Sequence, residues 1–99
     1  MKYTIPKEVS FGEQTFVVEK KERMPRFCLG RIHHNAELIE IATQDARKVK
    51  RTDEEMFDTY WHEVVHGILF EMGNDLWDDE AFVQEFAELL VESMKRVKL

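Results

Sequence analysis

The sequence contains few of the residues that mark secreted, fibrous or multi-domain proteins. Its single cysteine, Cys28, excludes an internal disulfide and fits a reducing compartment. Two prolines and four glycines leave no room for a low-complexity linker, and 99 residues are enough for one domain but not for two. No apolar run approaches the ~18 residues that a membrane span requires, and no signal peptide is recognised. We therefore expect residues 1–99 to form one soluble cytoplasmic domain without a membrane partner.

Positive charge is scarce in the second half of the chain. Residues 1–51 carry eleven Lys and Arg against seven Asp and Glu, whereas residues 52–99 carry three against thirteen. Nucleic-acid binding depends on clustered positive charge that contacts phosphates, so the net charge of −6 argues against a nucleic-acid partner. The one basic cluster, residues 47–51, is expected to be a solvated turn between two elements.

Residues 1–45 are expected to be mainly strands. Runs rich in β-branched and aromatic residues predict strands at Lys2–Ile5, Thr15–Glu19, Phe27–Ile32 and Glu37–Ala42. His33–Ala36 is the predicted turn of a hairpin between the last two.

Two helices are predicted after residue 51. The first, over residues 52–73, begins with a capping box in which Thr52 and Glu55 each satisfy the other's backbone N–H. Apolar residues then recur at steps of three and four, and Gly73-Asn74 supplies a left-handed C-cap; the apolar positions are Phe57, Trp61, Val64, Ile68 and Met72. A second apolar stripe of helical period lies within residues 79–97. The predicted fold is α+β: a small antiparallel sheet of three to four strands followed by two long helices.

The segment His62-Glu63-Val64-Val65-His66 has the spacing of a zinc site on a helix. Residues four apart share one helix face with Cβ atoms about 5–6 Å apart, so His62 and His66 can take adjacent corners of a tetrahedral Zn²⁺ site. Glu63, beside the first ligand, can reach a zinc-bound water and act as the general base.

The surroundings of this segment also favour a metal. Glu63 is the only charged residue between Thr59 and Phe70, and a buried carboxylate without a partner is expensive. The alternative is that His62 and His66 are interfacial histidines hydrogen-bonded to nearby acids, with Glu63 facing solvent.

A catalytic zinc site needs a third protein ligand, and the second predicted helix offers several glutamates. Simple hairpin geometry favours Glu85, because His66 lies six residues before Met72 and Glu85 lies six residues after Asp79.

From Thr52 to Leu90 the chain resembles the zincins, more narrowly the gluzincin branch of zinc metallopeptidases, whose third ligand is a glutamate on the following helix. The string Glu80-Ala-Phe-Val-Gln-Glu-Phe-Ala-Glu-Leu-Leu90 is similar to the Glu-x-x-Ala-Asn-x-Phe-Ala-x-x-Leu-Leu helix of phage-immunity and stress-response metallopeptidases, and to a related pattern in short phage-type proteins. This resemblance implies Glu80 as the third zinc ligand, with Glu85 as the alternative. It also implies that Gln84, one turn later, holds a histidine ring in place.

The resemblance implies a minimal zincin-like domain that hydrolyses a peptide bond in an intracellular protein or peptide substrate. In zincins an edge strand commonly binds the substrate backbone, and Glu37–Ala42 is the predicted strand for this role. Tyr60, His33 and His34 are the side chains considered for stabilising the oxyanion. The alternative function is a catalytically silent, zinc-stabilised protein–protein interaction module.

Overall fold

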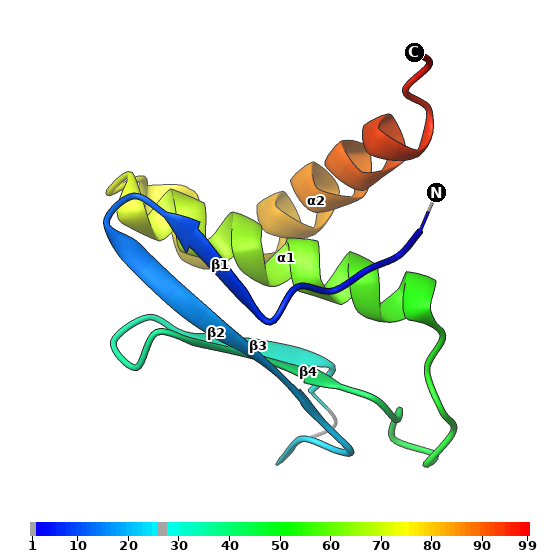
Figure 1. Cartoon of the computed structure of the whole chain (residues 1–99). Helices are drawn as coiled ribbons and strands as arrows, with labels where there is room; N and C mark the ends of the chain where they lie inside the picture. Colours follow the sequence, from blue (N-terminus) through cyan, green and yellow to red (C-terminus); the bar gives the residue numbers. More distant parts are fainter. Residues whose placement is uncertain (1, 26–27) are drawn as a thin grey trace.

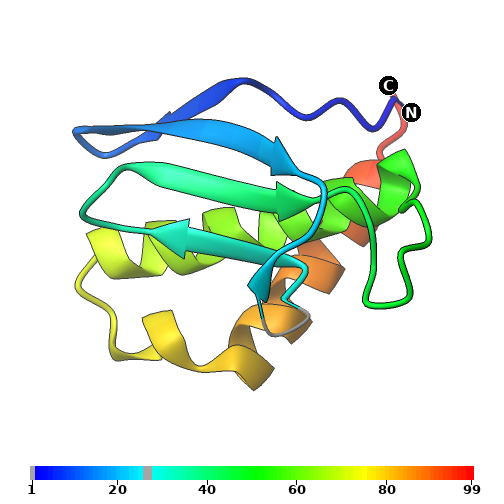
Figure 2. The ribbon, with the colours of Figure 1, turned by 90° about the horizontal axis from the view of Figure 1, so that it is seen from below.

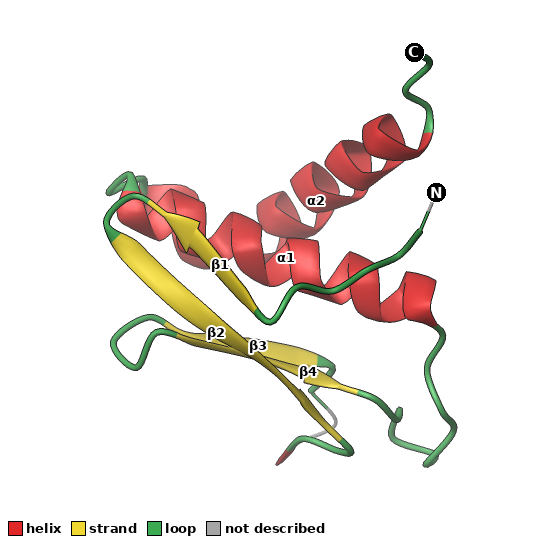
Figure 3. Cartoon of the chain, viewed as in Figure 1, coloured by secondary structure: helices red, strands yellow, loops and turns green. Residues whose placement is uncertain are grey.

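The structure, a computed structural model, describes residues 2–25 and 28–99. Its elements follow the chain in the order β1 (Glu8–Phe11), β2 (Gln14–Lys21), β3 (Gly30–His33), β4 (Leu38–Ala42), α1 (Asp53–Glu71), the short 3-10 helix η2 (Asp75–Asp78) and α2 (Glu80–Lys95). The sheet lies along one side of α1 and α2 packs on its other side (Figures 1 and 3). The predicted α+β class is confirmed. Within the described residues, neither long helix is apolar enough to cross a membrane.

The sheet is mixed, so the prediction of a purely antiparallel sheet is wrong at one pairing. The strand order is β1-β2-β4-β3, with antiparallel hairpins on the outside and a parallel pair, β2 and β4, in the middle. Figure 2 shows β2 and β4 pointing the same way, with β3 antiparallel at the edge. The reason lies in composition. β4 carries the fully buried Ile39 and Ile41 and takes the centre, whereas the glycine-containing and more polar β3 takes the edge.

The first strand lies later than predicted. Lys2–Ile5 forms no strand, and Tyr3 instead packs edge-on against Phe57 of α1, with ring centroids 5.5 Å apart. The tight turn at Gly12, which has a φ of +61°, sets the register of the first hairpin. Phe11 pairs with Gln14, and the pairing continues to Glu8 opposite Val17.

The predicted second hairpin is present with shifted bounds. The start of the predicted strand Phe27–Ile32 lies outside the described residues, and its described part is β3. The strand runs through His33, so the turn comprises residues 34–37 and ends at Glu37 with a φ of +52°.

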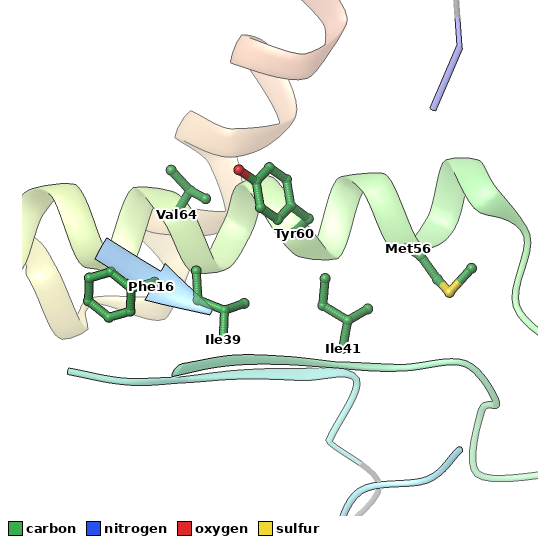
Figure 4. Close-up of a cluster of buried hydrophobic side chains, with 6 residues drawn as sticks. All are labelled: Phe16, Ile39, Ile41, Met56, Tyr60 and Val64. Carbon is green, nitrogen blue, oxygen red and sulfur yellow. The ribbon is translucent and has the colours of Figure 1, made fainter. Parts of the chain in front are cut away.

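Two apolar clusters bury α1 from opposite sides. The larger lies between the sheet and α1 and contains Phe16, Ile39, Ile41, Met56, Tyr60 and Val64 (Figure 4). The smaller lies between α1 and α2 and contains Val65, Val83 and Ala87. Because α1 has two buried sides, its core positions differ from the single predicted stripe: Ile68 and Met72 are 37% and 68% exposed.

Both predicted ends of α1 are confirmed. The capping box forms, with Glu55 N–H donating to Thr52 Oγ1 and Thr52 N–H donating to Glu55 Oε1, each at 3.1 Å. At the other end Gly73 has a φ of +67°, and the Asn74 N–H donates to the Leu69 carbonyl at 3.0 Å. This stop allows η2 to turn the chain back along α1.

Arg51 departs from the prediction that residues 47–51 form a solvated turn, because it is only 5% exposed. Its two terminal nitrogens bond four acceptors on the residue before β3, the end of β4 and the first turns of α1: Leu29 O (3.1 Å), Ala42 O (2.8 Å), Glu55 O (3.2 Å) and Thr59 Oγ1 (2.5 Å). Among the described residues no carboxylate forms a salt bridge with it. Arg51 therefore ties the sheet to the helix.

Candidate metal centre

Three side chains converge where the start of α2 meets the middle of α1. His62 Nε2 lies 3.0 Å from Glu80 Oε2, and His66 Nε2 lies 2.9 Å from Glu80 Oε1. The two Nε2 atoms are 3.1 Å apart. In the described part of the chain, this is the one group of three His, Cys, Asp or Glu donors that all lie within 4.8 Å of each other.

The structure brings Glu80, and not Glu85, to the two histidines. The hairpin geometry that favoured Glu85 assumed that α2 runs back beside α1 from a short loop. Instead η2 lies along the end of α1, so the first residue of α2 already reaches the histidines. Glu85, five residues further along α2, points in a different direction and is exposed.

The hydrogen bond at His66 Nδ1 makes Nε2 an acceptor that faces a second acceptor. His66 Nδ1 lies 2.6 Å from the carbonyl oxygen of Trp77, which only accepts, so Nδ1 carries the proton and donates. In the neutral ring Nε2 is then an acceptor, yet it faces a carboxylate oxygen of Glu80, a second acceptor. A proton or a metal ion between them removes this conflict.

The donor spacing also fits zinc. In a tetrahedral Zn²⁺ site with bonds of ~2.0–2.1 Å, neighbouring donors lie about 3.3 Å apart. The two Nε2 atoms are 3.1 Å apart, and each lies 2.9–3.0 Å from a different oxygen of Glu80, so these separations are close to that value. Two imidazole nitrogens and one carboxylate are a donor set that Zn²⁺ accepts, and the Trp77 carbonyl supplies the outer hydrogen bond that metal-binding histidines usually make.

Glu63 is buried rather than solvent-facing, with 7% of its surface exposed. A Cβ atom on Gly30 would lie only 3.1 Å from Glu63 Oε2 and 2.4 Å from the methyl group of Thr59. The glycine at the start of β3 therefore lets the sheet edge approach this carboxyl closely. Burial, with a smaller contribution from the negative charge of Glu80, raises the pKa of Glu63 to about 8.

The raised pKa predicts how pH affects the metal-free protein. The Glu63 carboxyl has an ordinary pKa of 4.5 and a folded-state pKa of about 8, so between these values the folded state binds more protons than the unfolded state. The stability that the protonated carboxyl allows is complete below pH 4.5 and is lost as the pH rises toward 8. Glu63→Gln stays neutral and is expected to exceed the wild type at pH 7 by up to roughly 3 kcal/mol, since one pKa unit is worth ~1.4 kcal/mol.

Urea denaturation of both proteins in the presence of a chelator, at pH 5 and pH 7, checks this expectation. The stability difference between the variant and the wild type should widen with pH. An equal difference at both values would contradict the raised pKa of Glu63.

The three converging residues and Glu63 line one open cleft of about 730 Å³. Its walls are α1, β3, η2 and the first turns of α2. Figure 2 shows β3 at the edge of the sheet nearest the start of α2. The prediction that Glu37–Ala42 is the edge strand is wrong, because β4 lies between β2 and β3. The edge strand at the cleft is β3.

The unpaired edge of β3 faces away from β4. The Ala42 N–H donates to the Leu29 carbonyl at 2.9 Å, and antiparallel pairing alternates, so the peptide groups of Gly30 and Ile32 point away from β4. The Cys28 thiol donates to the Gly30 carbonyl at 2.8 Å. Ile32 therefore offers the N–H and C=O groups at which a further strand would pair.

The remaining predicted site residues lie in different places. Gln84 lines the cleft, but its amide donates to Glu88 at 2.5 Å. The group that holds a histidine ring, that of His66, is instead the Trp77 carbonyl. A backbone carbonyl in a 3-10 turn leaves no signal in the sequence. Tyr60 is 3% exposed in the main core, and His33 lies 2.5 Å from Glu40. His34 lines the cleft.

Comparisons with protein families, curated proteins and solved structures find no significant match to this chain. Its function is therefore argued from its own residues and their geometry.

Proposed function

We propose that this protein is a zinc-dependent peptidase in which His62, His66 and Glu80 hold the metal and Glu63 is the general base. Zn²⁺ at this position would polarise a substrate carbonyl and lower the pKa of the attacking water. Glu63 takes the proton from that water as it attacks, which requires its ionised form. The positive charge of the bound ion would lower the pKa of this buried carboxyl and so favour that form. The observation that carries the proposal is the contact of His66 Nε2 with Glu80, two acceptors that a metal ion or a proton must bridge, at a place where His62 supplies a further metal donor.

The cleft supports an extended peptide as the substrate. A peptide that pairs with Ile32 would add a fifth strand beside β3, since main-chain hydrogen bonds recognise any extended backbone. Such a strand would run past Glu63, which abuts Gly30 two residues away. The scissile carbonyl would then lie between the general base and the converging donors.

The second candidate function, a catalytically silent interaction module stabilised by zinc, has one observation in its favour. Phe86 and Leu89 on α2 are 49% and 57% exposed, and large apolar side chains on a surface are common at contact sites. This function also requires the metal, so activity and not zinc binding separates it from the first.

Metal affinity tests the proposed centre. The wild type is expected to bind one zinc per chain, and Glu80→Gln should weaken binding by ~100-fold or more, since even the outer hydrogen-bond partners of metal ligands contribute 10–100-fold. Competition against a chromophoric chelator gives the affinity, and elemental analysis gives the stoichiometry.

The matched control is Glu85→Gln, which removes the same charge from the same helix outside the converging group and should keep wild-type affinity. A wild type that binds no zinc would overturn the proposal. A Glu80→Gln variant that binds as tightly as Glu85→Gln would remove Glu80 from the ligand set.

A further inference from the structure

A hydrogen-bond donor at the substrate's carbonyl oxygen would add to the charge stabilisation that a bound metal gives there. Attack of water on a carbonyl places negative charge on the carbonyl oxygen, and donors fixed in advance at that oxygen contribute strongly to the rate. Several polar side chains in the cleft are already committed. Both terminal nitrogens of Arg51 bond protein acceptors, the Thr59 hydroxyl donates to Glu55 O, and the Gln84 amide donates to Glu88.

His34 occupies the cleft with a ring held in one orientation. It directly follows β3, and its imidazole stacks on Phe70 with centroids 4.0 Å apart and an interplanar angle of 17°. Trp77 packs edge-on against the same imidazole at 5.4 Å. The carbonyl of Trp77 is the one that holds His66, so His34 lies next to the support of the converging donors.

Only one nitrogen of His34 is available for a ligand. Its Nδ1 is buried and has no hydrogen-bond partner among the described residues, whereas Nε2 is not sealed in this way. Nδ1 has no partner in either tautomer, but a buried N–H without an acceptor is rarer in proteins than a buried acceptor without a donor. We therefore assign the proton of the neutral ring to Nε2. Burial and the nearby His66 lower the pKa of His34, which favours this neutral form.

We propose that His34 donates a hydrogen bond from Nε2 to the substrate's carbonyl oxygen as negative charge develops there. This role rests on the proposed peptidase function and adds a catalytic residue to it. The position agrees with the substrate path, because His34 extends the edge strand along which the peptide would lie.

A tetrahedral anion can test this donor without a known substrate. The probe is N-phosphoryl-leucinamide, whose charged phosphoryl oxygens resemble the developing oxyanion, added to cobalt-loaded protein and followed by the visible absorption of cobalt. His34→Phe keeps an aromatic ring on Phe70 and removes both nitrogens. We expect it to weaken the probe by ~10-fold or more, as one charge-assisted hydrogen bond is worth roughly 1.5–3 kcal/mol. Its metal affinity should stay at the wild-type value.

Two controls give each outcome a meaning. His33→Phe changes the neighbouring histidine, which is paired with Glu40, and should bind the probe like the wild type. Equal probe affinity in His34→Phe and the wild type, or no probe binding by the metal-loaded wild type, overturns the role of His34 while zinc binding stands. A parallel loss of metal affinity in His34→Phe also overturns it, because the ring would then only support Trp77. Failure of the wild type to bind metal is instead failure of the proposed function.

Discussion

Glu63→Gln is expected to reduce peptide hydrolysis by at least ~10²–10⁴-fold, the usual contribution of a general base. The substitution keeps the size and burial of the side chain and removes its ability to take a proton. Because Glu63 is not one of the three converging donors, zinc affinity should remain at the wild-type value. If Glu63→Gln loses activity but keeps its zinc, Glu63 acts as a general base and not as a metal ligand.

The assay incubates zinc-loaded protein with a mixture of unfolded proteins and identifies new peptide termini by mass spectrometry. Glu71→Gln, an exposed glutamate near the end of the same helix, is the matched control and should cleave like the wild type. Cleavage by Glu63→Gln at the wild-type rate would show that another group takes the proton. Zinc binding without cleavage by any of the proteins would favour the interaction module.

Arg51→Met is expected to lower the free energy of unfolding by about 3 kcal/mol or more. Methionine preserves part of the aliphatic stem but leaves the carbonyls of Leu29 and Ala42 and the Thr59 hydroxyl without their donor, and each unsatisfied buried polar group costs ~1–3 kcal/mol. For a domain of this size, with a total stability of roughly 5–15 kcal/mol, this is a large fraction.

Urea denaturation of the metal-free proteins measures this loss. Arg47→Met is the matched control, because Arg47 belongs to the same basic cluster and is exposed. Its midpoint should stay close to that of the wild type. A loss below about 1 kcal/mol in Arg51→Met would mean that water replaces the guanidinium, and that Arg51 is not what ties β3 and β4 to α1.

Local signals predicted the features of this fold that depend on neighbouring residues. The capping box at Thr52, the left-handed stop at Gly73 and the histidine spacing all act within one or two helical turns, and the structure contains them. For the same reason His62 and His66 were predicted to lie on one helix face, and they do.

Features that depend on residues distant in sequence were missed. Which strand takes the centre of the sheet is decided by competition for burial between β3 and β4, and neither run shows this alone. In the sequence Arg51 resembles a solvated cation, but the fold brings to it the carbonyls of Leu29, just before β3, and of Ala42, at the end of β4. The choice between Glu80 and Glu85 depended on the path of η2, whose four residues have no strong local pattern. The resemblance to zincins chose Glu80, the residue that the fold brings to the histidines.

The converging donors all come from one continuous stretch of chain. His62 and Glu80 are 18 residues apart, and only the end of α1, η2 and two short connections lie between them. Closing so short a loop costs little conformational entropy, so metal binding at the proposed centre would not have to wait for the slower assembly of the sheet. Gly30, which lets the sheet edge approach Glu63, comes instead from the strand half. Under the proposed function, metal loading and catalytic competence would therefore be separable steps: the helical half would perform the first, and the second would begin when the sheet docks.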